Sequence, residues 1–309
     1  MAFDNNPRTW LSNSKTLNLL NQLAQASIKI AEYLIETRPN LIIVPLRGGF
    51  PVYMFARHAL LRMGEREYMQ RTKKLFATIS STMMIPLMNK AISSEIDDFL
   101  TKRIKELAKE EGFLKAVSAV FNPNFIERLL YKKIAVIDEV GTGMCWYILF
   151  SSNSRSITEI HLRDKLGLKE LYLIGISKKD KKIIRTGTIN SLKNSFNRNY
   201  PDVKLTAKIF DLDEVPFADN EPLLGINRRT AGSDEKKIYS FFTSKPPAVN
   251  FYFLINLLID IELIKTGKNK EIKNIEELKK DISKNKKLIS LMGEDFFAKI
   301  QEFLQNQSI

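Results

Sequence analysis

The chain has 309 residues, 44% hydrophobic and 27% charged, which are the proportions of a globular protein with a substantial core. Its single cysteine, Cys145, cannot form an internal disulfide, so we expect a protein of the reducing cytoplasm. One cysteine and two histidines are also too few for a Cys/His zinc cluster. The first residues lack a signal-peptide pattern, and the apolar run 251–264 is too short and too acidic to span a bilayer. The formal net charge of +13 is compatible with an anionic binding partner.

Periodic apolar positions and turn residues outline an alternating series of strands and helices. Helices are predicted at residues 15–37, 50–63, 93–111, 124–131, 144–150, 157–166 and 188–199. Strands are predicted at residues 41–46, 73–87 (one or two strands), 134–137, 170–177 and 203–210. Because strands joined through helices pair in parallel, we expect an α/β fold with a mainly parallel sheet flanked by helices.

The two ends of the chain lie outside this alternation. The helix at residues 15–37 forms an N-terminal addition. From Gly232 the composition changes, and a Lys-Pro-Pro sequence at residues 245–247 separates a tail with Lys- and Glu-rich helical faces. We therefore predict an α/β domain at residues 1–231 and a helical C-terminal extension at residues 232–309.

Residues 132–150 hold the densest group of candidate binding residues. The apolar run 134–137 suits a strand buried on both faces, and Asp138 and Glu139 follow at its carboxyl end, where open α/β sheets bind ligands. The Gly-Thr-Gly turn at residues 141–143 lets backbone N–H groups approach an anion, and the helix after it adds its positive end. Carboxylates suit ribose hydroxyls or hydrated Mg²⁺, and the turn suits a phosphate, so this stretch predicts half of a sugar-phosphate site. Capping of the next helix is the alternative role of the two carboxylates.

Two sequence motifs carry a family resemblance. The sequence IAVIDEVGTGM (residues 134–144) resembles the motif with which type I phosphoribosyltransferases bind 5-phosphoribosyl-1-pyrophosphate (PRPP). Upstream, LIIVPLRGGFPV (residues 41–52) resembles the pyrophosphate loop of the same family, and the order and separation of the two motifs match the family pattern. The resemblance covers about residues 41–227 and implies a type I phosphoribosyltransferase-like fold with helical N-terminal and C-terminal additions.

The resemblance also implies a role for each matching residue. Asp138 and Glu139 would hold the ribose hydroxyls, directly or through Mg²⁺. The 5-phosphate loop would comprise Val140, Gly141, Thr142, Gly143 and Met144, with the Thr142 hydroxyl and the backbone amides as donors. The pyrophosphate loop would comprise Leu46, Arg47, Gly48 and Gly49. Of these, Arg47 would act with Asp138 and Glu139 in catalysis.

A hood over the acceptor base is implied at residues 211–227. There Phe217 would stack on a ring, and Asp219 or Asn220 would bond its edge; an ordinary loop rich in Pro and Asx residues is the alternative. The resemblance further implies a mobile loop over the site, with four candidate contributors: Arg71, Lys73, Lys74 and Thr82.

The leading interpretation is a PRPP-dependent phosphoribosyltransferase that transfers 5-phosphoribosyl to an unidentified base or nitrogen acceptor, releases pyrophosphate and uses Mg²⁺. The alternative is a non-catalytic regulator or interaction protein that keeps the fold and binds a phosphorylated ribose. One departure separates the chain from the family: the phosphate loop is short, with Met144, Cys145 and Trp146 where hydroxyls are expected. This departure argues against purine salvage more than against PRPP binding. A homodimer is implied by the resemblance alone.

The basic charge is concentrated downstream of the phosphate loop. Residues 163–208 hold 12 Lys or Arg against 4 Asp or Glu, a field that would steer a polyanion such as PRPP; a solvated surface is the alternative. The sequence shows no zinc finger, RNP-like aromatic pattern or clear helix-turn-helix, so nucleic acid is the least favoured partner.

Overall fold

The computed structural model of the protein describes residues 6–45, 48–77, 132–143, 146–147, 150, 168–217, 223 and 248–307. Contacts divide the chain into two compact units. The first, which we call the sheet unit, comprises Thr37–Tyr53 and Gln70–Asp211. The second, the helical unit, comprises Met1–Glu36, Met54–Met69 and Leu212–Ile309. The domain boundary predicted between residues 231 and 232 lies outside the described residues and stays a prediction.

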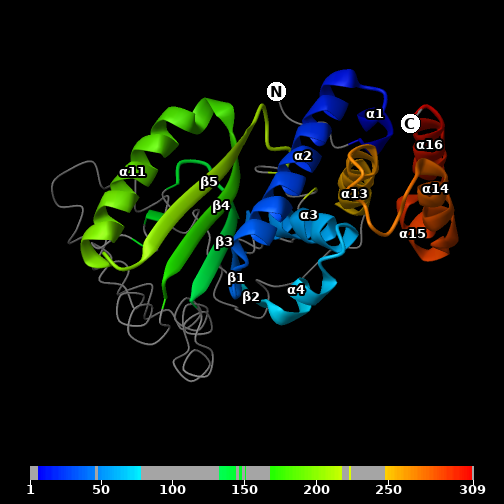
Figure 1. Cartoon of the computed structure of the whole chain (residues 1–309). Coiled ribbons are helices and arrows are strands. Elements are labelled where there is room, and N and C mark those ends of the chain that lie inside the picture. Colours follow the sequence, from blue (N-terminus) through cyan, green and yellow to red (C-terminus); the bar gives the residue numbers. More distant parts are fainter. Residues whose placement is uncertain are drawn as a thin grey trace, which may run out of the picture. The chain divides into compact units, whose positions relative to one another are not determined.

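The sheet unit is built on five parallel strands, which confirms the predicted α/β class. The strands are β1 (Leu41–Pro45), β2 (Lys73–Ala77), β3 (Lys133–Glu139), β4 (Glu170–Lys178) and β5 (Lys204–Leu212). Their order across the sheet is β2-β1-β3-β4-β5 (Figure 1). In register, Ile43 of β1 lies opposite Val136 of β3, and Asp138 of β3 lies opposite Gly175 of β4. The end of β3 is therefore flanked by strands on both sides.

One face of the sheet packs against helix α11 (Lys182–Asn199), which runs along the strands beside β4 and β5 (Figure 1). Its apolar side chains Ile189, Leu192 and Phe196 share a core cluster with alternate residues of β1, β3 and β4. Trp146 and Phe150, from the segment after β3, belong to the same cluster. Burial on both faces explains why the central strands are apolar at every position rather than at alternate ones.

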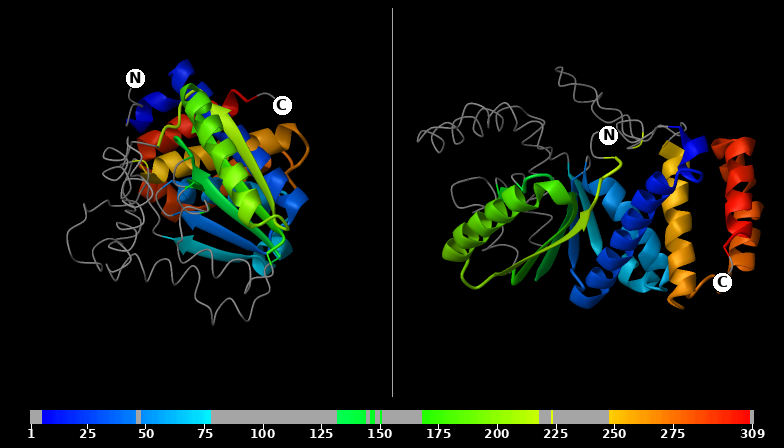
Figure 2. Two further views of the ribbon diagram at one scale, coloured as in Figure 1. Left: turned by 90° about the vertical axis from the view of Figure 1, so that its left-hand side faces the viewer. Right: turned by 90° about the horizontal axis from the view of Figure 1, so that it is seen from above.

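The helical unit surrounds one strongly apolar helix, α13 (Ala248–Lys265). Around it lie α1 (Pro7–Trp10), α2 (Ser14–Thr37), most of α3 (Gly49–Arg62), α4 (Arg66–Arg71), α14 (Ile275–Lys284), α15 (Lys286–Met292) and α16 (Glu294–Gln305), as Figure 2 shows. Phe251 of α13 is the centre of an aromatic group, with ring centroids 6.0 Å from Trp10 and 5.9 Å from Phe55. A helix that is apolar all round has no solvent side, and α13 fits this rule. Among the described helices, none combines the length and apolar character needed to cross a bilayer.

Most predicted elements that fall on described residues are confirmed. The helices predicted at residues 15–37 and 50–63 correspond to α2 and α3, and Gly64 ends α3 with a φ of +83°. The main difference is α11, which begins at Lys182, six residues before the predicted start. The helices predicted at residues 93–111, 124–131 and 157–166 lie outside the described residues.

Candidate functional site

The two motifs meet at the carboxyl edge of the sheet, because β1 and β3 are parallel neighbours. Gly48 lies so close to the end of β3 that a Cβ atom on it would be 2.6 Å from Asp138 Oδ1 and 3.1 Å from Glu139 Cβ. A Cβ atom on Gly49 would be 2.1 Å from the carbonyl oxygen of Ile137. Real Cβ atoms do not approach other atoms so closely, so Gly49 requires glycine, and a side chain at Gly48 would force the Asp138 carboxylate or the turn to move. The Gly-Gly turn after β1 is thus packed directly onto the acidic pair.

The acidic pair closes β3, and its first member is held firmly. Asp138 is only 6% exposed, and its Oδ1 accepts a hydrogen bond from the backbone N–H of Glu139 at 2.9 Å. Glu139 is the last residue of β3 and is half-buried. The two carboxylates therefore have different surroundings, one fixed in the protein and one nearer to solvent.

The loop after β3 presents consecutive backbone amides. Val140 still belongs to the sheet, since its N–H donates to the carbonyl of Ile176 at 2.8 Å. Within the described part of the chain, the N–H groups of Gly141, Thr142 and Gly143 donate no hydrogen bond. Gly143 has a φ of +80°, and its carbonyl accepts the helical bond from Tyr147 N at 3.0 Å. Successive amides of this kind in a turn can bind an anion, and the role of residues 141–143 as a phosphate loop stays a prediction.

Four residues that support this loop were not predicted from the sequence. Gly175 lies beside Asp138 in β4, and a Cβ atom on it would be 2.5 Å from Val140 Cγ2 and 3.2 Å from Trp146 Cη2. Its sequence signature is a glycine inside an otherwise apolar strand, which often marks close approach of another segment. The other three are Ser177, Arg185 and Asp211, which no local pattern in the sequence distinguishes.

These three side chains form a hydrogen-bonded chain behind the loop, which we call the loop brace. Asp211, in β5, accepts a hydrogen bond from Arg185 Nη2 of α11. Arg185 Nη1 donates to the hydroxyl of Ser177, in β4, and to the carbonyl of Lys178 at 3.3 Å. The Ser177 hydroxyl donates in turn to the carbonyl of Val140.

Several predicted site residues fall outside the described residues: Leu46, Arg47, Met144, Asp219, Asn220 and Thr82. Their roles stay predictions. Phe217 is described and is fully buried, with its ring centroid 6.4 Å from that of Phe251 in the helical unit. Its ring therefore has a packing role in the core of that unit.

The candidates for a mobile loop are placed differently from the expectation. Lys73 and Lys74 begin β2, and Lys73 lies opposite Leu41, the first residue of β1. Both lysines are thus at the amino edge of the sheet. A five-residue strand separates that edge from the acidic pair by about 13 Å. Arg71 precedes them in α4, so none of the three belongs to the carboxyl edge.

Asp138 and Glu139 are the predicted ligands of Mg²⁺. Among the described residues, no group of three or more His, Cys, Asp or Glu side chains is arranged to hold a metal. Mg²⁺, however, commonly uses one or two protein carboxylates and completes its shell with water and substrate phosphates. Asp138 and Glu139 fit that donor set only together with a phosphorylated ligand.

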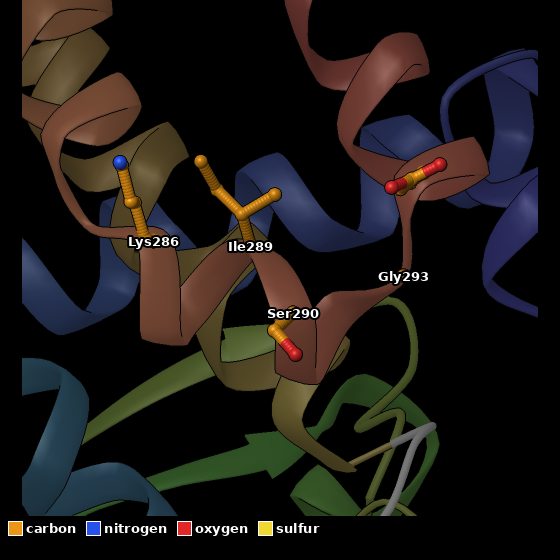
Figure 3. A pocket seen from close by; sticks show the side chains of 5 residues that line it. Lys286, Ile289, Ser290 and Gly293 are labelled. Carbon is orange, nitrogen blue, oxygen red and sulfur yellow. The ribbon is translucent and has the colours of Figure 1, made fainter.

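A pocket lies away from these residues, in the helical unit. An open pocket of about 330 Å³ is lined by Lys286, Ile289, Ser290, Gly293 and Glu294 of α15 and the start of α16. Figure 3 shows that Lys286 and Ile289 project to one side of α15 and Ser290 to another. Its labelled polar side chains, Lys286 and Ser290, do not converge on one point.

Comparison with known proteins adds no relative. No protein family model matches the chain, and neither a curated protein nor a solved structure matches it. The candidate site is therefore argued from its own residues.

Proposed function

We propose that the protein is a PRPP-dependent phosphoribosyltransferase whose sheet unit has a type I phosphoribosyltransferase-like fold. The observation that carries the proposal is the close packing of the Gly48-Gly49 turn on Asp138 and Glu139. PRPP has a phosphate at one end, a pyrophosphate at the other and a ribose between them. In this proposal the Gly48-Gly49 turn, the acidic pair and the loop at residues 141–143 would bind the pyrophosphate, the ribose and the phosphate, respectively.

The ribose would lie against the acidic pair. Glu139, the more accessible carboxylate, is suited to accept hydrogen bonds from the 2- and 3-hydroxyls. The 5-phosphate would be bound by the amides of residues 141–143 with the Thr142 hydroxyl, so the short loop depends mainly on backbone donors. The pyrophosphate would face the Gly48-Gly49 turn, with Arg47 as the predicted cation.

The reaction requires positioning more than covalent chemistry. A nitrogen atom of the acceptor forms a bond to C1 of the ribose, the bond from C1 to the pyrophosphate oxygen breaks, and pyrophosphate leaves with the electron pair. The nitrogen then loses its proton to solvent. Asp138 and Glu139 would hold Mg²⁺ together with the ligand, and this ion would neutralise charge on the departing pyrophosphate. The protein orients PRPP and supplies fixed donors where negative charge develops.

The test is calorimetric titration of PRPP with Mg²⁺ into the wild type, the double variant Asp138→Asn/Glu139→Gln, and the control Glu170→Gln. Glu170 is also a half-buried carboxylate of the sheet, but it stands at the amino end of β4. We expect saturable binding by the wild type and by Glu170→Gln, and none by the double variant. Equal binding by all three proteins would refute the proposed site.

A second assay separates the enzyme from its alternative. Release of pyrophosphate from PRPP on addition of a base or another nitrogen acceptor would support the transferase. Saturable PRPP binding without release by any acceptor would favour the non-catalytic regulator.

A further inference from the structure

The loop brace has a defined direction of hydrogen bonding, and this direction determines what it can do. The guanidinium of Arg185 has donors only, so the Ser177 oxygen must accept from it. The hydroxyl of Ser177 has two possible acceptors, and its one proton goes to the nearer one, the carbonyl of Val140, rather than to that of Lys178 at 3.5 Å. Asp211 fixes the other arm of the guanidinium. The brace therefore fixes the Val140 carbonyl in one direction, toward the Ser177 hydroxyl.

Burial makes the brace rigid. Ser177 is fully buried and Arg185 is 3% exposed, so water does not compete for their bonds. Hydrogen bonds between charged and neutral groups in such surroundings are stronger than those on a surface. A buried guanidinium also costs free energy unless it is paired, and the partner here is Asp211.

The fixed carbonyl determines the direction of the next amide. In a trans peptide the C=O and N–H groups point to opposite sides of the chain. Because the carbonyl of Val140 points to Ser177 in β4, the N–H of Gly141 points away from β4. On Gly141 a Cβ atom would meet no atom of the described residues within 4 Å, so the chain is not closely packed there. The brace thus directs the first of the three loop amides away from β4, at a position that is not closely packed.

We propose that Ser177, Arg185 and Asp211 are positioning residues that orient the Val140–Gly141 peptide toward the 5-phosphate of the ligand. This inference rests on the proposed function, because it assigns the anion of the loop to the 5-phosphate of PRPP. The sequence alone places the site in the two loops after β1 and β3, and the inference adds residues from β4, β5 and α11. A purely structural role for Arg185, joining α11 to β5, would not need Ser177 or Val140.

The test separates the two ends of the ligand. Ribose 5-phosphate probes the loop after β3, and pyrophosphate with Mg²⁺ probes the Gly48-Gly49 turn. Both are titrated calorimetrically into the wild type, Ser177→Ala, Asp211→Asn and the control Thr186→Ala. Thr186 lies on α11 beside Arg185, and its hydroxyl bonds only the carbonyl of Lys182 in its own helix.

We expect Ser177→Ala and Asp211→Asn to bind ribose 5-phosphate about tenfold more weakly, the effect of one hydrogen-bonded group. Their affinity for pyrophosphate should equal that of the wild type, and Thr186→Ala should leave both ligands unchanged. Arg185→Lys keeps the charge but loses the forked donor geometry, so it should bind ribose 5-phosphate with intermediate affinity.

Four results would overturn the inference. Unchanged affinity of Ser177→Ala for ribose 5-phosphate shows that the hydroxyl does not position the loop. Equal weakening of both ligands shows a general structural role for the brace. If the wild type binds pyrophosphate but not ribose 5-phosphate, the loop has another ligand. A wild type that binds neither fragment nor PRPP refutes the proposed function itself, and the inference fails with it.

Discussion

At the scale of single residues, glycines define the candidate site more sharply than charged side chains do. Gly48, Gly49 and Gly175 each lie where a Cβ atom would collide with the end of β3 or the loop after it. At Gly49 and Gly175 the collisions include backbone oxygens, so side-chain rotamer changes cannot relieve them; at Gly48 the closest atom is Oδ1 of the buried Asp138 side chain. Substitution at these positions should therefore affect both stability and the site.

The variant Gly175→Ala tests this at β4. Its Cβ would meet Val140 Cγ2 at 2.5 Å and the carbonyl of Asp138 at 2.8 Å, so we expect a loss of about 1–3 kcal/mol in the free energy of unfolding. Denaturant unfolding measures the loss. Gly187→Ala is the matched control, because nothing lies within 4 Å there and alanine favours the helix; it should be neutral or stabilising. Equal stability of the two variants would contradict the packing described.

The variant Gly48→Ala tests the other motif. A Cβ atom 2.6 Å from Asp138 Oδ1 must displace either the turn or the carboxylate. We expect affinity for PRPP with Mg²⁺ to fall at least tenfold, because both the pyrophosphate turn and the acidic pair are disturbed. Fluorescence of Trp146 in a Trp10→Phe background provides a titration signal from the sheet unit, since the chain has two tryptophans. PRPP affinity equal to that of the parent protein would place the ligand elsewhere.

At the scale of elements, an ion-pair cluster connects the helices of the helical unit. Asp260 of α13 is buried; its Oδ1 lies 3.0 Å from Arg62 Nε and 2.9 Å from His58 Nε2. Arg62 also reaches Glu271 at 3.0 Å. Burial alone would lower the pKa of Arg62, but the charge of Asp260 and the hydrogen bonds outweigh it and raise that pKa.

Removing the buried member of this cluster should be costly. We expect Asp260→Ala to lose about 3–5 kcal/mol in the free energy of unfolding, because the half-buried Arg62 loses its one buried partner among the described residues. Asp281→Asn is the control: its carboxylate is 3.5 Å from Arg62 and mostly exposed, so the loss should stay below about 1 kcal/mol. Similar losses of unfolding free energy in both variants would mean that the strength of these ion pairs does not depend on burial.

The same cluster makes stability depend on pH. Burial would raise the pKa of Glu271, but hydrogen bonds from Arg66 and Arg62 outweigh it and hold the pKa below its ordinary value of 4.5. Since the folded-state pKa is the lower one, the stabilisation is present above about pH 4.5 and is lost as the pH falls through the folded pKa. The difference in unfolding free energy between wild type and Glu271→Gln should therefore be constant near neutrality and vanish in acid. A difference that persists in acid would show that Glu271 acts through packing.

The elements that could be predicted from the sequence share one property: the pattern of their apolar residues indicates which faces are buried. Strands β1, β3 and β4 are continuous apolar runs, and α2 repeats its apolar residues at helical spacing. The sequence does not predict the start of α11 because its first turn buries no apolar side chain: Ile183 is 87% exposed and Ile184 60%. With lysines on either side, that turn resembles a solvated loop.

At the scale of the whole molecule, the two loops of the site could be predicted because each follows a buried strand. Parallel pairing of β1 and β3 brings them to one edge, and this follows from the alternation of strands and helices. The loop brace could not be predicted, since Ser177, Arg185 and Asp211 meet only through tertiary packing. Arg185 in particular is one cation within a segment rich in them.

The net charge of +13 has a consequence for binding kinetics. A basic protein attracts a polyanion at a distance, and salt screens that attraction. We expect the association rate of PRPP, measured by stopped-flow fluorescence, to fall with added salt while the dissociation rate changes less. An association rate independent of salt would show that the basic residues lie too far from the site to steer the ligand.

The central claim is that the two loops form one site that PRPP spans. It is tested most directly by displacement in the wild type: PRPP with Mg²⁺ is bound, and ribose 5-phosphate or pyrophosphate is added in separate titrations. We predict that each fragment displaces PRPP and that each binds more weakly than PRPP, because the linked ligand gains from both loops. Fragments that bind without displacing PRPP would contradict the claim.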